Sequence, residues 1–167
     1  QKGSMVAPDR LRFDFSHNQA VTPDEIADIE AEVNAQIRRN TAVTTRLMAP
    51  DQAVEAGALA LFGEKYGDEV RVLSMGEVEG RIYSVGRCGG THVNALGDIA
   101  LMSIVSEGAV ASGIRRIVAL TGEAARLHLA NRESQLKDVA SLFKVSPDEV
   151  AARVETLLAE RRALEKE

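Results

Sequence analysis

The sequence predicts an α+β fold, in which a mixed or antiparallel sheet packs with helices and a helical segment follows. Two observations support this prediction. Residues 1–122 contain short apolar or alternating runs separated by glycines, which are typical of strands, together with one long amphipathic helix. Residues 123–167 contain one proline and no glycine, and their apolar residues recur at helical spacing. We therefore predict an α+β domain over 1–122 and a helical segment over 123–167.

The first helix has a strong start signal. Thr22 can act as the N-cap, Pro23 suits the first helical position, and Glu25 completes a capping box. Apolar residues then recur at helical spacing, and we expect the helix to end near Asn40. Residues 11–15, before this helix, alternate between apolar and polar side chains. That alternation predicts a half-buried strand.

Further elements are predicted by aliphatic or β-branched runs between glycines: strands at 43–48, 69–75, 81–85, 99–105 and 114–120, and a short helix at 50–56. Gly76 and Gly80 bracket the connection between the second and third of these strands, which predicts a hairpin. Gly108 and Gly113 lie in the expected loop between the last two strands. We place those two strands in the same sheet as the hairpin.

The C-terminal segment begins its last helix with a second capping box, at Ser146 and Glu149. An apolar stripe follows on this charged helix: Val150, Val154, Leu157, Leu158 and Leu164. Such a stripe needs a partner to bury it. The partner is either the preceding helix, in a helical hairpin, or a second copy of the chain in a coiled-coil-like homo-oligomer.

The composition is that of an ordinary globular protein, with 45% hydrophobic and 27% charged residues among 167. One cysteine cannot form an internal disulfide, so no oxidising compartment is implied. No apolar run approaches the roughly 20 residues of a membrane helix, and the N-terminus has no apolar signal region. We predict a cytoplasmic protein without membrane contact. The net charge of −5 argues against broad, nonspecific binding of nucleic acid but allows a local basic surface.

The run RCGGTH, residues 87–92, contains the only cysteine and one of three histidines. Cys88 and His92 stand four residues apart around two glycines, and Zn²⁺ accepts a mixture of thiolate and imidazole ligands. Two ligands are too few, because a structural site needs four and a catalytic site usually needs three and a water. His17 and His128 have no matching partner in the sequence. The alternative is a buried cysteine beside a histidine in a tight turn.

Several segments, in order, resemble the editing domain of the alanyl-tRNA synthetase family: QKGS, APDRLRFDFSH, VNAQIRRN, ALFGEKYGDEVRVLSMG, CGGTH and GDIALMSIVSEGAVASGIRRIVALTG. The resemblance covers residues 1–122, and the helical remainder is similar to the connection towards the C-terminal domain in that family. The same fold family includes the editing domain of threonyl-tRNA synthetases and free-standing alanyl editing proteins. The resemblance implies that the rest of a synthetase chain is a partner of this segment.

This resemblance implies a Zn²⁺ site made by a His-x-x-x-His pair on a helix and by a Cys-x-x-x-His pair. Cys88 and His92 match the second pair. The first pair is expected upstream of Gln1, and no His-x-x-x-His occurs in these 167 residues. This stretch alone is therefore expected to hold zinc poorly. Gly86 and Arg87 also depart from the family pattern, which usually has an acidic residue and a leucine before the cysteine.

The implied activity is hydrolysis of the ester in seryl- or glycyl-tRNA(Ala), with the tRNA acceptor end as ligand. An editing site is needed because one methylene or hydroxyl group gives only about 10–200-fold discrimination in a single binding pocket. Zinc can activate the carbonyl or a water, or only position the substrate. The preference between serine and glycine also stays open. ATP is implied only for the aminoacylation domain, which lies elsewhere in a synthetase chain.

Roles for further residues follow from the resemblance. Gln1 matches a glutamine of the editing pocket, and Gln1 and Thr91 can hydrogen-bond the serine hydroxyl or a water. The backbone N–H groups of Gly89 and Gly90 can stabilise an oxyanion. Thr91 can equally serve only to stabilise its turn.

Arg115 and Arg116 stand at the start of a predicted strand, so alternation sends them to opposite faces. We expect one to contact tRNA phosphates and the other to be solvated. Asp14 faces either the cleft, Arg12 or solvent. Two other functions remain: a tRNA-binding or scaffold fragment without catalysis, and an unrelated metal-binding or dimerisation module.

Overall fold

The computed structural model describes residues 1–57 and 69–165. The first nine residues of the run ALFGEKYGDEVRVLSMG lie outside the described residues. The chain forms two compact units, Gln1–Ala125 and Arg126–Glu167. Each unit is described by itself.

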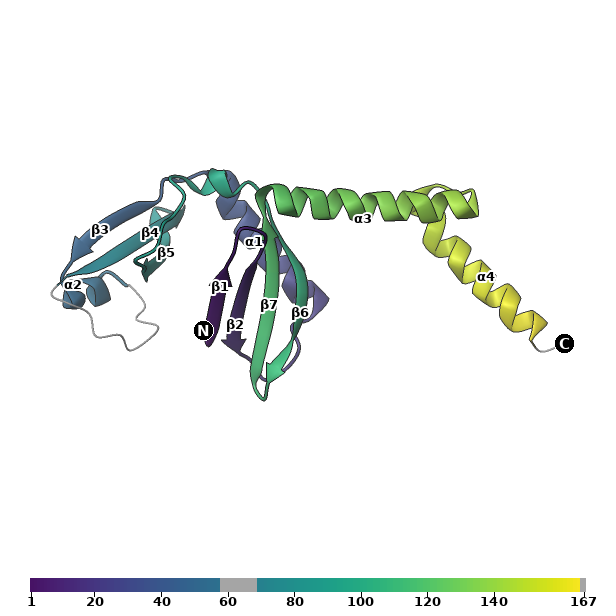
Figure 1. The fold of residues 1–167 in the computed structure, drawn as a ribbon, viewed down its shortest axis with the longest axis horizontal. Helices are drawn as coiled ribbons and strands as arrows, with labels where there is room; N and C mark the ends of the chain where they lie inside the picture. The colour runs from purple at the N-terminus through teal and green to yellow at the C-terminus, as the bar shows by residue number, and fades with distance from the viewer. Residues whose placement is uncertain (58–68, 166–167) are drawn as a thin grey trace. The chain divides into compact units, whose positions relative to one another are not determined.

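A four-stranded antiparallel sheet forms the first layer of the N-terminal unit, in the order β1-β2-β7-β6 (Figure 1). Its strands are β1 (Gly3–Val6), β2 (Leu11–Ser16), β6 (Met102–Ala111) and β7 (Ile114–Thr121). The alternation at 11–15 correctly predicted β2. Strand β1 was not predicted, because four residues carry too little of a period-two pattern to be distinguished from a loop.

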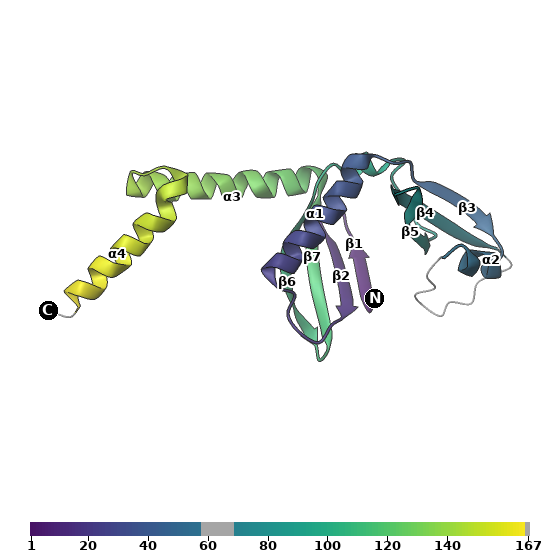
Figure 2. The same cartoon turned by 180° about the vertical axis from the view of Figure 1, so that it is seen from behind.

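Helix α1 (Pro23–Arg39) covers one face of this sheet, as Figure 2 shows. Its predicted capping box is confirmed: the Thr22 hydroxyl accepts the Glu25 N–H, and the Glu25 carboxylate accepts the Thr22 N–H at 2.8 Å. Asn40 ends the helix in the left-handed conformation, with φ of 52°. The core beneath α1 buries Ile37, Met102 and Ala119, with Leu11, Val33, Ile99 and Ile104 packed against them.

Helix α1 also protects the edge strand β6. The Asn34 side chain donates to the carbonyl of Met102 and accepts its N–H, at 2.8 and 2.9 Å. The Glu30 carboxylate accepts the N–H of Ile104 and the Ser103 hydroxyl. An exposed edge offers unpaired backbone groups to other chains. Polar side chains of α1 occupy some of these groups here, so the helix is fixed by hydrogen bonds as well as by apolar packing.

The second sheet of this unit is three-stranded and antiparallel, in the order β3-β4-β5. Its strands are β3 (Thr44–Met48), β4 (Val70–Val78) and β5 (Arg81–Arg87), and the short helix α2 (Pro50–Glu55) follows β3. Its core contains Ala53, Val70 and Val72, with Met48 and Val85 against them. The predicted short helix and hairpin are thus confirmed.

The prediction of one continuous sheet was wrong, because β6 and β7 do not pair with the β4–β5 hairpin. Strand β7 pairs with β2 instead, and this register sets Ala119 opposite Leu11. Both side chains belong to the core beneath α1. The sheets therefore separate because each completes a different apolar core, one beneath α1 and one beside α2. Sequence periodicity contains no information on which of these cores a strand joins.

Some predicted boundaries shift by a few residues. Gly76 lies inside β4 with φ of 72°, against Tyr83, while the hairpin turn contains Glu79 and Gly80. Ile99 closes a short 3₁₀ turn, η1 (Leu96–Ile99), and does not belong to a strand. Gly108 lies within β6 and outside the loop. Glycine therefore lies within strands here as well as in turns.

The second unit contains most of α3 (Gly122–Phe143), a 3₁₀ turn η2 (Pro147–Glu149) and α4 (Val150–Leu164). The Glu149 carboxylate accepts the Ser146 N–H at 2.9 Å and the Ser146 hydroxyl at 2.7 Å, so the predicted helix-start signal forms. Large apolar side chains remain exposed on both helices: Leu127, Leu129, Leu136, Val139, Leu142, Val154, Leu158 and Leu164. Among the described residues, no helix is both long and apolar enough to cross a membrane.

Candidate functional site

Residues 88–92, here called the CGGTH loop, connect strand β5 to the turn η1. All five residues are exposed. The loop starts where β5 leaves its pairing with β4, and the N–H of Cys88 still donates to the carbonyl of Arg71 at 3.3 Å. Cys88 and His92 thus lie on a surface loop, and the alternative of a buried cysteine is wrong.

Arg71 in β4 holds the first half of this loop with its side chain as well as its backbone. Its Nη1 atom donates to the carbonyl of Gly90 at 3.0 Å and to the carbonyl of Gly89 at 3.4 Å. Neither glycine has a positive φ. The double glycine is therefore not required here by a left-handed backbone, and its carbonyls are oriented by one guanidinium.

The segment that follows the loop is fixed by the residues after α1. The N–H of Val43 donates to the carbonyl of Asn94 at 2.9 Å, and the N–H of Leu96 donates to the carbonyl of Thr41 at 3.0 Å. The Asn40 side chain accepts the N–H of Gly97 at 2.9 Å. The CGGTH loop is therefore an exposed segment between two anchored ends.

The metal-binding capacity of the described residues is limited. None of them form a group of three or more histidine, cysteine or acidic side chains that could hold a metal ion. Cys88 and His92 are chemically suited to zinc, but they supply two donors where four are normal. His17 lies at the end of β2, and His128 lies on α3 in the other unit. In donor chemistry alone, Cys88 and His92 are thus suited to be two of the four ligands of a zinc site.

Gln1 precedes β1 and is half-buried, and Thr91 is exposed in the CGGTH loop. Within the described residues, neither side chain makes a hydrogen bond. Both side chains therefore keep their hydrogen-bonding groups available for a ligand or water.

Arg115 and Arg116 lie on opposite faces of β7, and each is held by a carboxylate. Arg115 donates to Glu107 at 2.5 and 2.6 Å, and Arg116 donates to Asp14 at 2.7 and 2.8 Å. These hydrogen bonds lower the pKa of both carboxyl groups below their ordinary values. We expected one arginine to contact tRNA phosphates and the other to be solvated. In the structure, both guanidinium groups are instead paired with a carboxylate.

Comparison with known proteins gives a specific result. The family described as "Threonyl and Alanyl tRNA synthetase second additional domain" matches residues 70–118. Alanine–tRNA ligases of Sphingopyxis alaskensis, Rhizorhabdus wittichii and Parvibaculum lavamentivorans are 67%, 64% and 59% identical to the chain over its whole length. The chain belongs to the alanyl-tRNA synthetase family. It spans about a fifth of these relatives, 19% of each.

In this synthetase segment, the matched stretch runs from β4 to β7 and contains the whole CGGTH loop. It also contains Arg71, Arg115 and Arg116. Sequence reasoning missed Arg71, because a single arginine in a strand pattern looks like any solvent-facing residue. Only the β4–β5 register, which pairs Val72 with Arg87, shows that the end of β5 and the loop lie beside it.

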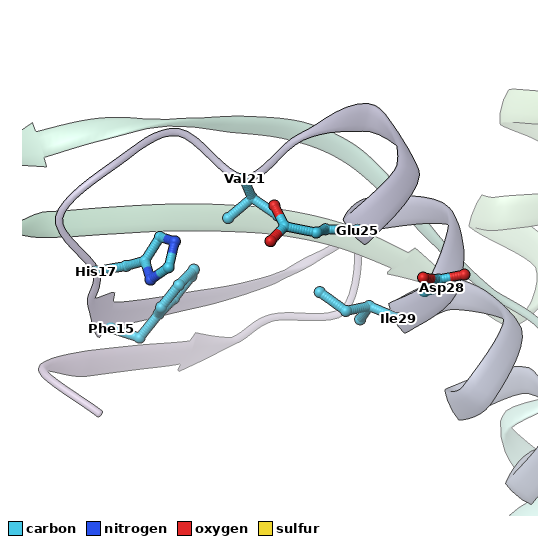
Figure 3. A pocket seen from close by; sticks show the side chains of 6 residues that line it. All are labelled: Phe15, His17, Val21, Glu25, Asp28 and Ile29. Carbon is cyan, nitrogen blue, oxygen red and sulfur yellow. The ribbon is translucent and has the colours of Figure 1, made fainter.

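A separate shallow pocket of about 320 Å³ opens between the end of β2 and the start of α1 of the synthetase segment (Figure 3). Phe15 and Ile29 form apolar walls, while His17 and Glu25 contribute polar atoms. No residue of the CGGTH loop lines it. His17 is therefore a pocket residue beside an aromatic ring, with ring centroids 6.2 Å apart.

Proposed function

We propose that this chain is the editing part of an alanyl-tRNA synthetase, which hydrolyses the ester of mischarged seryl- or glycyl-tRNA(Ala). The observation that carries the proposal is the CGGTH loop: it presents Cys88 and His92 to solvent and lies inside the stretch that matches the family. An exposed loop with both ends anchored can admit a large ligand such as a tRNA terminus.

The need for such a site follows from binding energetics. A pocket that accepts alanine cannot strongly exclude glycine, which is smaller, or serine, which adds one hydroxyl group. A second site that cleaves the wrong product supplies the missing discrimination. The reaction releases the free amino acid and the intact tRNA.

Cys88 and His92 are the residues of this chain that would hold Zn²⁺, and two further ligands would come from residues outside it. When bound, the metal polarises a carbonyl, lowers the pKa of a water towards about 7, or orients the substrate. Thr91 and Gln1 would contribute hydrogen bonds to the serine hydroxyl or to the attacking water. The backbone N–H groups of Gly89 and Gly90, in the same loop, would stabilise the oxyanion.

The proposed partners are the acceptor end of tRNA(Ala) and the remainder of the synthetase chain, in the cytoplasm. ATP would serve only the aminoacylation part of that chain. The apolar side chains exposed on α3 and α4, Leu142 and Leu164 among them, support a contact with other helices or a second copy. The paired state of Arg115 and Arg116 means that a tRNA phosphate would have to compete with Glu107 or Asp14 for them.

The deciding experiment compares deacylation of seryl-tRNA(Ala) by this chain and by a form extended upstream through the expected histidine pair. Alanyl-tRNA(Ala) is the control substrate, Cys88→Ser in the extended form is the control variant, and zinc content is measured for each protein. We expect only the extended form to carry zinc and to cleave the seryl ester. If neither form cleaves it, the editing assignment fails for this protein.

A second candidate is a non-catalytic tRNA-binding or scaffold fragment. It is favoured by one observation, that the described residues form no group of three or more histidine, cysteine or acidic side chains that could hold a metal ion. In this case the chain alone would bind the tRNA acceptor end in a salt-sensitive way and leave the ester intact. Retention of seryl-tRNA(Ala) without deacylation, measured by filter binding at several salt concentrations, would identify it.

A further inference from the structure

The orientation of two peptide groups in the CGGTH loop is set by one side chain. Nη1 of Arg71 donates to the carbonyl oxygens of both Gly89 and Gly90, at 3.4 and 3.0 Å. Two successive carbonyl groups therefore converge on a single nitrogen atom. The same residue accepts the N–H of Cys88 through its own carbonyl, so its backbone also fixes the start of the loop.

The geometry of the peptide bond carries this orientation to the N–H groups. A trans peptide is planar, and its N–H points away from its C=O. No described peptide bond is cis. The carbonyl of Gly89 shares a plane with the N–H of Gly90, and the carbonyl of Gly90 shares a plane with the N–H of Thr91. Because both carbonyls face Arg71, these two N–H groups face the opposite side of the loop.

These two N–H groups are available for a ligand. In the part of the chain that the structure describes, neither Gly90 nor Thr91 donates its N–H to another residue, and both residues are exposed. Two N–H groups on the same side of a loop can both donate to one anionic oxygen. Cys88 and His92 flank this pair of donors in the sequence.

The geometry points to a specific role: the N–H groups of Gly90 and Thr91 stabilise the oxyanion that forms during ester hydrolysis, and Arg71 is the positioning residue that aims them. This inference rests on the proposed editing function and deepens it. It also moves the donor pair one residue along the chain from Gly89 and Gly90, because an oriented carbonyl fixes the N–H of the following residue.

The chemical step needs these donors at a defined moment. The oxygen of a water bonds to the ester carbonyl carbon, and the C=O electron pair moves onto the carbonyl oxygen, which becomes the oxyanion. The C=O bond then re-forms, and the bond from carbon to the ribose oxygen breaks. The proton that the water loses ends on that ribose oxygen, giving a free tRNA hydroxyl and the amino acid. Donors aimed at the oxyanion stabilise the transition state more than the ground state.

The test uses the full-length ligase with Arg71→Met, and Arg81→Met as the matched control. Arg81 lies in β5 of the same sheet, and in the described residues it has no hydrogen bond to the loop. We expect Arg71→Met to lower kcat for seryl-tRNA(Ala) on the order of 100-fold, because losing one oxyanion donor typically costs about 100–1,000-fold. KM should change little, since the donors act on the transition state. Arg81→Met should match the wild type.

Two hydrolysis-resistant analogues of 3′-seryladenosine give a readout that is independent of turnover. One is an amide with a neutral trigonal carbonyl, and the other is a phosphonamidate with an anionic tetrahedral oxygen. Arg71→Met should weaken binding of the phosphonamidate on the order of 100-fold and leave amide binding unchanged. In the wild-type protein, the phosphonamidate but not the amide should shift the NMR amide proton signals of Gly90 and Thr91 downfield. This last measurement needs no variant to fold.

Equal losses of affinity for both analogues, or unshifted signals of Gly90 and Thr91, would overturn the inference. If the wild-type ligase hydrolyses seryl-tRNA(Ala) and Arg71→Met does so with the same kcat, the inference fails while the proposed function stands. If the wild-type ligase hydrolyses no mischarged ester, the proposed function fails and the inference fails with it.

Discussion

The carboxylate of Asp14 accepts two parallel hydrogen bonds from the guanidinium of Arg116, at 2.7 Å from Nε and 2.8 Å from Nη2. The two residues lie directly opposite each other on β2 and β7. Asp14 is nearly buried, and Arg12 approaches it at 3.8 Å as a second cation. This bidentate pair connects the two central strands of the first sheet on the face opposite the core beneath α1.

The Asp14 pair predicts a specific dependence of stability on pH. The hydrogen bonds from Arg116 lower the pKa of Asp14 below its ordinary value of 3.8 in the folded state. A carboxyl group with a lowered folded pKa stabilises the fold above its unfolded pKa, and this stabilisation is lost as the pH falls through the folded pKa. We expect Asp14→Asn to lower Tm at pH 7 and the difference from wild type to shrink below about pH 4.

Thermal unfolding followed by circular dichroism from pH 7 to pH 2.5 measures this difference. Asp9→Asn is the matched control, because Asp9 forms only an exposed pair with Arg10 at 3.9 Å. A Tm difference for Asp14→Asn that stays constant over this pH range would contradict the prediction.

A second prediction concerns Asn34, whose side chain binds both backbone groups of Met102. Asn34→Ala should lower the free energy of unfolding by about 1–3 kcal/mol, because a partly buried backbone donor and acceptor lose their partner. The gain in helix propensity from alanine offsets a fraction of this loss. Urea unfolding measures the change. Asn18→Ala, at an exposed loop position, should leave the stability unchanged, and an equally stable Asn34→Ala would show that this pair contributes nothing.

A third prediction concerns the close approach of Gly97 to Asn40. A Cβ atom on Gly97 would lie 2.3 Å from Oδ1 of Asn40, so alanine there must displace the side chain that accepts its N–H. We expect Gly97→Ala to cost about 1–3 kcal/mol of stability. The cost should fall by more than half in an Asn40→Gly background, which removes the clashing side chain and suits the left-handed φ of 52°.

A double-mutant cycle by urea unfolding gives the coupling between the two positions. Gly108→Ala is the control, because no atom lies within 4 Å of its Cβ position. Additive effects of Gly97→Ala and Asn40→Gly would show that the two residues do not clash.

A fourth prediction separates two glycines that look alike in the sequence. At Gly76 the φ is 72°, and a Cβ atom would lie 2.8 Å from Cβ of Tyr83, so Gly76→Ala should cost about 2 kcal/mol or more. At Gly89 the φ is not positive and no atom lies within 4 Å, so Gly89→Ala should change stability by less than about 0.5 kcal/mol. Urea unfolding of the two variants side by side measures both. The opposite order would show that the backbone at these positions differs from the one described.

Local signals predicted the individual elements well. The capping box at Thr22 and Glu25 fixed the start of α1 because all of its atoms lie within four residues of each other. The resemblance to the family depended on long motifs and was confirmed by relatives that match the whole chain. The position of the CGGTH loop after the second hairpin strand also followed from the local pattern of strands and glycines. That Cys88 and His92 bind zinc stays a prediction, and so do the two further ligands expected outside this chain.

The relations between distant segments could not be read from the sequence. Nothing in the strand pattern indicates that β7 pairs with β2, so Asp14 could not be predicted as the partner of Arg116. Arg115 pairs with Glu107 on the neighbouring strand β6, and that contact depends on the β6–β7 register. The same applies to Arg71, whose distance from the loop in the chain hides its contact with Gly89 and Gly90. Each of these contacts depends on strand register, which is set by the packing of a whole sheet against its core.

The sequence by itself determined the α+β class, the capped start and the end of α1, and the family, because these depend on short-range periodicity, capping chemistry and contiguous motifs. Only the tertiary structure decided that there are two sheets, that both arginines of β7 are paired, and that Arg71 orients the CGGTH loop. Those outcomes follow from which apolar faces are buried together. That choice is made by the free energy of the whole packed unit and leaves no local signal in the chain.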